Sequence, residues 1–304
     1  MDGIGTKSIL SPRVSVATGR PGISGLEYTR NAEASTTNHK RIDWEHMGNQ
    51  ILLEVCADSV ESALAAQTGG ASRIELCSDL LEGGVTPSAG LIATLRKKLD
   101  IDLYVMIRPR GGDFCYTPAE FEAMQADIAM ARQLGANGVV FGILWEDGSI
   151  DIARTLKLVE LARPLNTTFH RAFDMSRHLH ESLEAVIETG ASRILTSGGE
   201  QKVEDGIPVI AELTRAARGR VSMMVGGGIT ESNVRRIVEL AGVREVHASL
   251  RVSVPSPMMY RNEQVSMGSA QGREYQRAIV LQERVERLLG CANGAYGASG
   301  AGQI

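Results

Sequence analysis

Residues 51–79 read ILLEVCADSVESALAAQTGGASRIELCSD and contain one full unit of the pattern that decides the fold. Two near-continuous apolar runs, ILLEVCAD (51–58) and RIELCSD (73–79), flank an amphipathic segment that stops at Gly69. Strands that are apolar along their whole length are typical of parallel sheets, in which both faces are buried. Glycine is the common residue just after a helix. This stretch therefore predicts a strand, a helix and a second, parallel strand.

The same unit recurs along the chain. Six further apolar runs follow at even spacing: DLYVMIRPR (102–110), GVVFGIL (138–144), NTTFHRAFD (166–174), RILTSGG (193–199), VSMMVGGGI (221–229) and EVHASLR (245–251). The phrase Gly-Ala-x-x-Ile/Val precedes the second, fourth and sixth runs, beginning at Gly70, Gly135 and Gly190. Eight evenly spaced strands fit a closed sheet better than the alternative, an open doubly wound sheet. We therefore predict an α/β fold, a (β/α)8 TIM barrel in a single domain.

The two ends of the chain lack this pattern. Residues 1–49 are rich in Ser, Thr and Gly without sustained periodicity, which predicts a disordered extension before a barrel domain at 50–290. Because its first 26 residues hold a single acid, a transit peptide to an organelle is the alternative. The small-residue sequence CANGAYGASGAGQI (291–304) predicts a flexible tail.

The composition excludes several classes of partner. A formal net charge of −4 and only 4% aromatic residues argue against binding of nucleic acid. No apolar run approaches the roughly 20 residues that span a bilayer, so we expect no membrane partner. Four cysteines in 304 residues are too sparse for a disulfide scaffold and indicate free thiols in a reducing compartment, the cytoplasm.

The first two strands share the sequence Glu-x-Cys. Alternation along a strand puts Glu54 on the side of Cys56, and Glu75 on the side of Cys77. Neighbouring strands lie about 4.8 Å apart, so the two thiols could meet at the mouth of the barrel, the carboxyl ends of its strands. Cys115 follows the third strand as a third candidate. Thiolates suit Cu(I) or Zn(II), while burial as small apolar side chains is the alternative.

Two segments are candidates for binding an anion. The third strand ends in Arg108 and Arg110 beside a Gly-Gly turn, which could hold a carboxylate or phosphate. A salt-bridge network within the mouth loops is the alternative. The seventh strand ends in Gly226, Gly227 and Gly228 before a helix, where barrels often hold phosphate on backbone N–H groups. A tight turn is the alternative there.

Acid–base candidates also lie at strand ends. The fifth strand ends in His170 and Asp174, which alternation puts on one side, with Arg171 on the other. A histidine at this end of a barrel strand can be a general base or a metal ligand, and a structural histidine is equally consistent. Together with Glu54 and Glu75, these residues are the candidate catalytic groups.

From Leu52 to about Arg287 the chain resembles the CutC family, named for copper homeostasis. The matching words are LLEVCADSVESAL, GGASRIELCS, LEGGVTPSAGLI, IRPRGGDFCY, TFHRAFD, RILTSGG, VGGGIT, EVHAS and SPMMYRN. The resemblance implies a (β/α)8 barrel, a cytosolic homo-oligomer (a dimer or tetramer) and Cu(I) binding through cysteines at the positions of Cys56 and Cys77. Cys115 falls where the family pattern admits Leu.

Two hypotheses about function follow. The first is a copper homeostasis protein that binds Cu(I) through Cys56 and Cys77, with Cys115 as an accessory thiol. The second is a TIM-barrel enzyme of unknown reaction that acts on a small phosphorylated or carboxylated metabolite. In the second, the arginines and glycines would hold the anion while His170 and a glutamate move protons.

Overall fold

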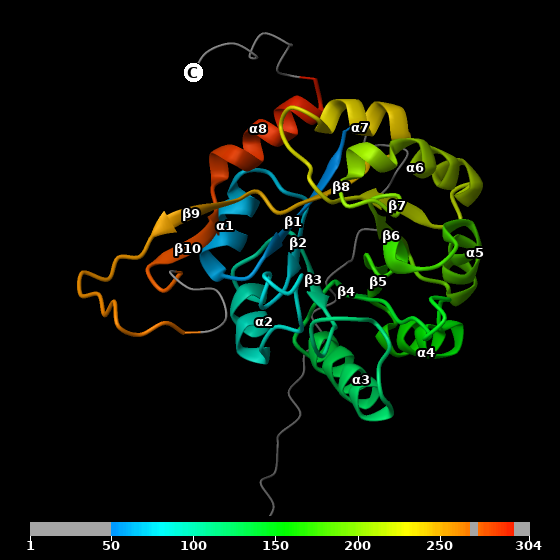
Figure 1. Ribbon diagram of the computed structural model, residues 1–304, viewed down its shortest axis with the longest axis horizontal. Coiled ribbons are helices and arrows are strands. Elements are labelled where there is room, and N and C mark those ends of the chain that lie inside the picture. The colour runs from blue at the N-terminus through cyan, green and yellow to red at the C-terminus, as the bar shows by residue number, and fades with distance from the viewer. Residues whose placement is uncertain (1–49, 268–272, 295–304) are drawn as a thin grey trace, which may run out of the picture. The chain divides into compact units, whose positions relative to one another are not determined.

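A computed structural model describes residues 50–267 and 273–294, so the predictions for 1–49 and for the tail beyond 294 lie outside the described residues. Eight parallel strands close into a barrel in sequence order, and the helices form a ring around it (Figure 1). The predicted TIM barrel is therefore confirmed. The strands are β1 (Leu52–Ala57), β2 (Arg73–Leu76), β3 (Asp102–Met106), β4 (Gly138–Phe141), β5 (Asn166–Phe169), β6 (Arg193–Thr196), β7 (Ser222–Val225) and β8 (Glu245–Ala248).

Side-chain caps begin several of the helices. Ser59 accepts a hydrogen bond from the Ser62 amide, and Thr117 forms a reciprocal capping box with Glu120. No described helix combines the length and hydropathy that crossing a membrane requires. The helices are α1 (Val60–Thr68), α2 (Ala89–Arg96), α3 (Pro118–Gln133), α4 (Ile152–Ala162), the short 3-10 turn η1 (Phe173–Met175), α5 (Leu179–Thr189), α6 (Val203–Ala217), α7 (Val234–Ala241) and α8 (Gln282–Ala292).

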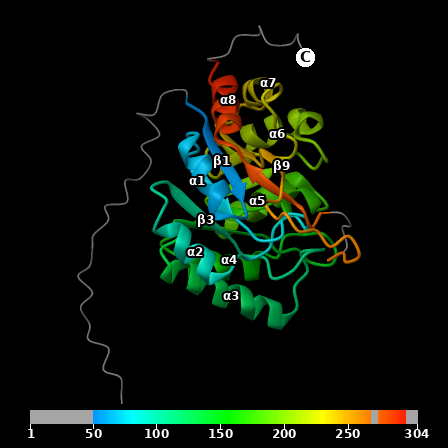
Figure 2. The same ribbon diagram turned by 90° about the vertical axis from the view of Figure 1, so that its left-hand side faces the viewer.

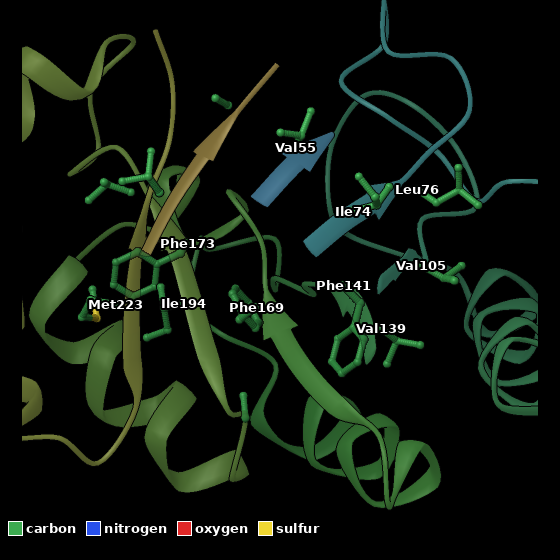
Figure 3. Close-up of a cluster of buried hydrophobic side chains, with 14 of the residues drawn as sticks. Val55, Ile74, Leu76, Val105, Val139, Phe141, Phe169, Phe173, Ile194 and Met223 are labelled. Carbon is green, nitrogen blue, oxygen red and sulfur yellow. The ribbon is translucent and has the colours of Figure 1, made fainter. Parts of the chain in front are cut away.

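The main hydrophobic core lies between the strands and the helices. Alternate strand residues, among them Val55, Ile74, Val105 and Phe141, join one large cluster of buried side chains (Figure 3). A smaller apolar cluster lies inside the barrel. It is formed by residues that alternate with the outward ones: Cys77, Tyr104, Met106 and Val140. The near-continuous apolar runs of the sequence therefore divide into an outward set that packs on helices and an inward set that fills the barrel.

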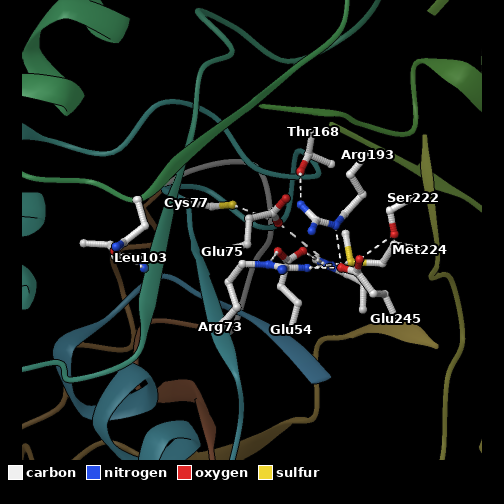
Figure 4. Close-up of polar contacts among 12 residues, drawn as sticks. Glu54, Arg73, Glu75, Cys77, Leu103, Thr168, Arg193, Ser222, Met224 and Glu245 are labelled. Atoms are coloured by element: carbon white, nitrogen blue, oxygen red, sulfur yellow. Dashed lines mark hydrogen bonds and ion pairs between the residues drawn. The ribbon is translucent and has the colours of Figure 1, made fainter. Parts of the chain in front are cut away.

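Much of that inward set is charged (Figure 4). Arg73 on β2 binds Glu54 on β1 and lies 2.8 Å from Glu245 on β8, and Arg193 on β6 binds the same Glu245. All four side chains are buried. The Tyr104 ring lies 4.6 Å from the guanidinium carbon of Arg73 and 5.6 Å from that of Arg193. These side chains link strands on different sides of the barrel.

A hairpin and the last helix follow the barrel strands. Strands β9 (Arg251–Pro255) and β10 (Gln276–Val280) pair in antiparallel fashion outside the barrel, and β10 packs against α1 (Figures 1 and 2). The amide of Val280 donates to Ser62 Oγ at 3.1 Å. After α8, Asn293 Oδ1 accepts a hydrogen bond from the Ile51 amide at 3.0 Å. The chain after β8 thus returns to brace the first strand and the first helix.

We predict that Gly206→Ala destabilises the barrel. Gly206 lies within α6, where an added Cβ would lie 2.0 Å from the carbonyl oxygen of Ser197, the residue after β6. The helix and the strand end must therefore separate, at a cost of about 1–3 kcal/mol in the free energy of unfolding. Urea denaturation measures that free energy.

Gly90→Ala in α2 is the matched control. An added Cβ there meets no atom closer than 3.9 Å, so alanine should leave stability unchanged or raise it by up to about 1 kcal/mol. Equal effects of the two substitutions would show that the close approach of α6 to β6 does not constrain the fold.

Candidate functional site

The pairing of β1 and β2 sets the relative positions of the two inward thiols. Cys56 lies opposite Glu75, and Glu54 lies opposite Arg73, so Cys77 falls two residues further along the barrel than Cys56. Strands of a closed barrel are staggered in this way because they tilt relative to its axis. Cys56 therefore has the carboxylate of Glu75 as its neighbour on β2. The two Glu-x-Cys motifs are offset by two residues along the barrel.

Three side chains from neighbouring strands converge at this position. One ligand atom each of Cys56, Glu75 and His247 lie within 4.8 Å of one another. The Nδ1 atom of His247 lies 2.8 Å from Glu54 Oε1, and its Nε2 atom lies 3.8 Å from Glu75 Oε2. Because Nδ1 is hydrogen-bonded to Glu54, Nε2 is the ring nitrogen that faces Glu75.

Burial and charge set the protonation of this group. Burial would raise the pKa of Glu54, but the charge of Arg73 and the hydrogen bond from His247 lower it to about 2. Burial raises the pKa of Glu75 to about 7 against the opposing charge of His247. Although burial alone would lower it, the charge of Glu75 and hydrogen bonds with Cys56 and Glu54 raise the pKa of His247 well above its ordinary value. At neutral pH His247 is therefore an imidazolium beside an ionised Glu54.

Cys77 lies in a more apolar setting than Cys56. Its thiol donates to Glu75 Oε2 at 3.5 Å and packs in the inner cluster with Tyr104, Met106 and Val140. Burial raises the pKa of the Cys77 thiol well above its usual range, and the charges of Glu75 and Cys56 raise it further. At neutral pH Cys77 is therefore a neutral thiol.

A cavity of about 720 Å³ opens at the mouth of the barrel, and we call it the mouth cavity. Its polar lining includes Glu75, Arg108, His170 and His247, and Cys115 lies at its wall. Loops after β2, β3, β4 and β5 form most of that wall. Glu75 and His247 therefore belong both to the thiol group and to the cavity, whereas Cys115 belongs to the cavity alone.

The two arginines after β3 have different partners. Arg110 forms ion pairs with Asp113 at 2.9 Å and Glu120 at 2.7 Å, so it ties the loop to α3. Arg108 is buried and donates to three backbone carbonyls, those of Glu82, Gly84 and Gly112. No carboxylate among the described residues forms an ion pair with Arg108. The salt-bridge alternative thus describes Arg110, and the anion hypothesis remains open for Arg108.

His170 is buried beside the cavity. Its Nδ1 accepts a hydrogen bond from the Ala172 amide at 3.2 Å, which places the proton of the neutral ring on Nε2. That Nε2 has no hydrogen-bond partner among the described residues. Burial and the charge of Arg108 lower the pKa of His170 to about 3. The ring fits because position 142 is glycine: an added Cβ there would lie 2.6 Å from His170 Nδ1.

The expected separation of Arg171 from Asp174 is wrong. Strand β5 ends at Phe169, so alternation no longer applies, and Arg171 Nε lies 2.7 Å from Asp174. The Asp174 carboxylate also accepts bonds from the amides of Ser197 and Gly199. Its oxygens are occupied by the loop after β6, which is a structural role.

The glycine run after β7 lies away from the cavity lining. The Gly227 carbonyl accepts from the Val203 amide at 2.8 Å, and the Gly228 carbonyl accepts from Asn233 Nδ2 at 2.9 Å. Gly226 makes room for His247, because an added Cβ would lie 3.2 Å from the histidine Cβ. These contacts fit the tight-turn alternative.

Sequence reasoning did not connect His247 with the thiols, and it assigned no role to Arg73, Arg193 and Glu245. The sequence does contain an indication of the buried arginines: the motif Ala-Ser-Arg-Ile occurs twice and puts an arginine at the start of both β2 and β6. A charge inside a strand that is otherwise apolar needs a buried partner. Glu54 and Glu245, on the adjoining strands β1 and β8, are such partners.

Comparison with known proteins shows the family to which the chain is similar. A family model described as the CutC family matches residues 51–252. The copper homeostasis protein cutC homolog of Mus musculus is 52% identical over 242 residues, 79% of this chain and 89% of that protein. The family protein CutC of Bacteroides fragilis is 50% identical over 237 residues, 77% of this chain and 94% of that protein. A crystal structure of a CutC protein from Streptococcus agalactiae has a TM-score of 0.63 and 35% identity, covering 65% of this chain and 98% of its own.

We predict opposite protonation states for the two site histidines. At pH 7 His247 should be doubly protonated, whereas His170 should be neutral with its proton on Nε2 and stay so as the pH falls to about 4, above its pKa of about 3. Long-range ¹H–¹⁵N NMR of the imidazole rings measures both states. Loss of one set of signals in His247→Gln assigns that ring. A His170 ring that titrates near pH 6.5 would contradict the burial argument.

Proposed function

The chain belongs to the CutC family, and we propose that it serves copper homeostasis by binding Cu(I) at Cys56 and His247. Cys77 supplies a further thiolate from the neighbouring strand. The convergence of Cys56, Glu75 and His247 within 4.8 Å carries this proposal. Relatives named copper homeostasis proteins support the choice of metal.

The donor atoms suit a soft monovalent ion. Cu(I) prefers thiolate and imidazole ligands to carboxylate oxygens, so Cys56 Sγ and His247 Nε2 are the favoured pair. Glu54 holds the other ring nitrogen of His247 at 2.8 Å. A carboxylate on the far nitrogen of a metal-binding histidine orients the ring and raises its basicity. Arg73 in turn fixes Glu54, so the ring is held by a chain of buried contacts.

Glu75 has a different task in this proposal. It lies next to both thiols and accepts the Cys77 hydrogen bond. Because thiols and imidazolium must lose protons before they bind a metal, a nearby carboxylate can take up a proton that the metal displaces. With its pKa near 7, Glu75 is suited to that exchange at neutral pH.

Anaerobic titration of Cu(I) against a chromophoric chelator tests the proposal. Cys56→Ser and His247→Gln should each weaken Cu(I) affinity by more than about 100-fold, and Cys77→Ser by about 10-fold. Affinity of the wild type should increase with pH, because binding releases protons.

Cys291→Ser and Cys115→Ser are the matched controls. Cys291 lies in α8 and Cys115 in the loop after β3, and neither belongs to the convergent group. Both variants should bind Cu(I) as the wild type does. Unchanged affinity in the Cys56→Ser/Cys77→Ser double variant would refute the proposal.

A further inference from the structure

The mouth cavity is far larger than a copper ion requires. It encloses about 720 Å³, and its lining does not include Cys56 or Cys77. Binding sites for small organic molecules have volumes of about 300–1,000 Å³ and combine apolar walls with a few polar groups. Here Met106, Phe114, Leu144 and Leu195 supply apolar surface. The volume and lining therefore fit an organic ligand.

The cavity has a buried cation that no carboxylate neutralises. The Arg108 side chain is 5% exposed and, among the described residues, has no ion pair. Its guanidinium donates to carbonyls of Glu82, Gly84 and Gly112 at 2.6–3.0 Å, which hold it in place. A buried charge without a counter-charge is costly, so an anion that enters beside it gains a strong interaction.

Other charged side chains at the cavity already have partners. Arg171 pairs with Asp174 at 2.7 Å, and His247 lies 3.8 Å from Glu75. Glu82 and Glu146 are exposed to solvent at the rim. Arg108 is thus the cationic group of the cavity wall with which an anionic ligand can form an ion pair.

A neutral donor lies close to Arg108. The His170 side chain is 4% exposed, and its Nε2 has no partner among the described residues. The ring centroid of Phe114 lies 5.0 Å from that of His170 and 5.1 Å from the guanidinium carbon of Arg108. One cation and one N–H donor therefore flank the same aromatic ring.

These groups fit a carboxylate better than a phosphate. Phosphate sites in barrels use several backbone N–H groups of the loops after the later strands. Here the amides of Ser197 and Gly199 already donate to Asp174, and the glycines after β7 do not line the cavity. A single cation with one further donor matches a monoanion that has two oxygens in one plane.

We propose that the mouth cavity binds a small organic carboxylate. Its carboxylate group pairs with Arg108 and accepts a hydrogen bond from His170, while its apolar body lies against Phe114, Leu144 and Leu195. Neither thiol lines the cavity, although His247 and Glu75 do, and the proposal can be tested on copper-free protein.

Saturation-transfer difference NMR tests this proposal with benzoate and hexanoate and with their uncharged amides, benzamide and hexanamide. Full-length, copper-free wild type should bind both acids and bind the amides at least about 10-fold more weakly, because the amides lack the charge that pairs with Arg108. Excess inorganic phosphate should not displace the acids. Arg108→Met should weaken binding of the acids by a similar factor.

Two further variants make the result specific. Arg220→Met removes an exposed cation that pairs with Glu184, so it should leave acid binding unchanged. Phe114→Ala keeps Arg108 but removes the ring, so it should weaken binding even if Arg108→Met does not fold. Equal signals from acids and amides, binding of neither acid, or displacement by phosphate at equal concentration would each overturn the proposal.

Discussion

The interior of the barrel depends on one buried ionic network. Arg73 and Arg193 share Glu245, and Arg73 also holds Glu54, all of them shielded from water. Transfer of a charged group from water into the protein interior costs free energy. If one partner of a buried ion pair is removed, the remaining charge stays buried without compensation, which strongly destabilises the fold. The four side chains must therefore be placed together, and that requirement ties β1, β2, β6 and β8 to one register.

The candidate site is built directly upon this network. Glu54 uses one oxygen for Arg73 and the other for His247, so the ring that faces Cys56 is fixed through two buried contacts. Glycines then supply the room that the imidazoles need: Gly142 lies beside His170, and Gly226 lies beside His247. A site carried by strands in this way is held more rigidly than one carried by loops.

The fold could be predicted from the sequence because apolar strand segments recur eight times at even spacing. The sequence also put Glu54 on the side of Cys56 and Glu75 on the side of Cys77, since alternation holds within a strand. Alternation failed at Asp174, because β5 ends at Phe169 and the chain then turns. The stagger that puts Glu75 opposite Cys56 depends on barrel closure, a property of all eight strands together. His247 joins the site only once β8 lies beside β1.

Copper at the thiol group and a carboxylate in the mouth cavity would be coupled, because Glu75 and His247 belong to both. A metal ion that displaces the proton of His247 exchanges one positive charge for another, and Glu75 can change its protonation in response. The field at Arg108 would then depend on which cation is present. Linkage makes any such effect reciprocal: whatever factor copper imposes on carboxylate affinity, the carboxylate imposes on copper affinity. Through this shared pair of residues, the two proposed ligands would influence each other without any movement of the barrel strands.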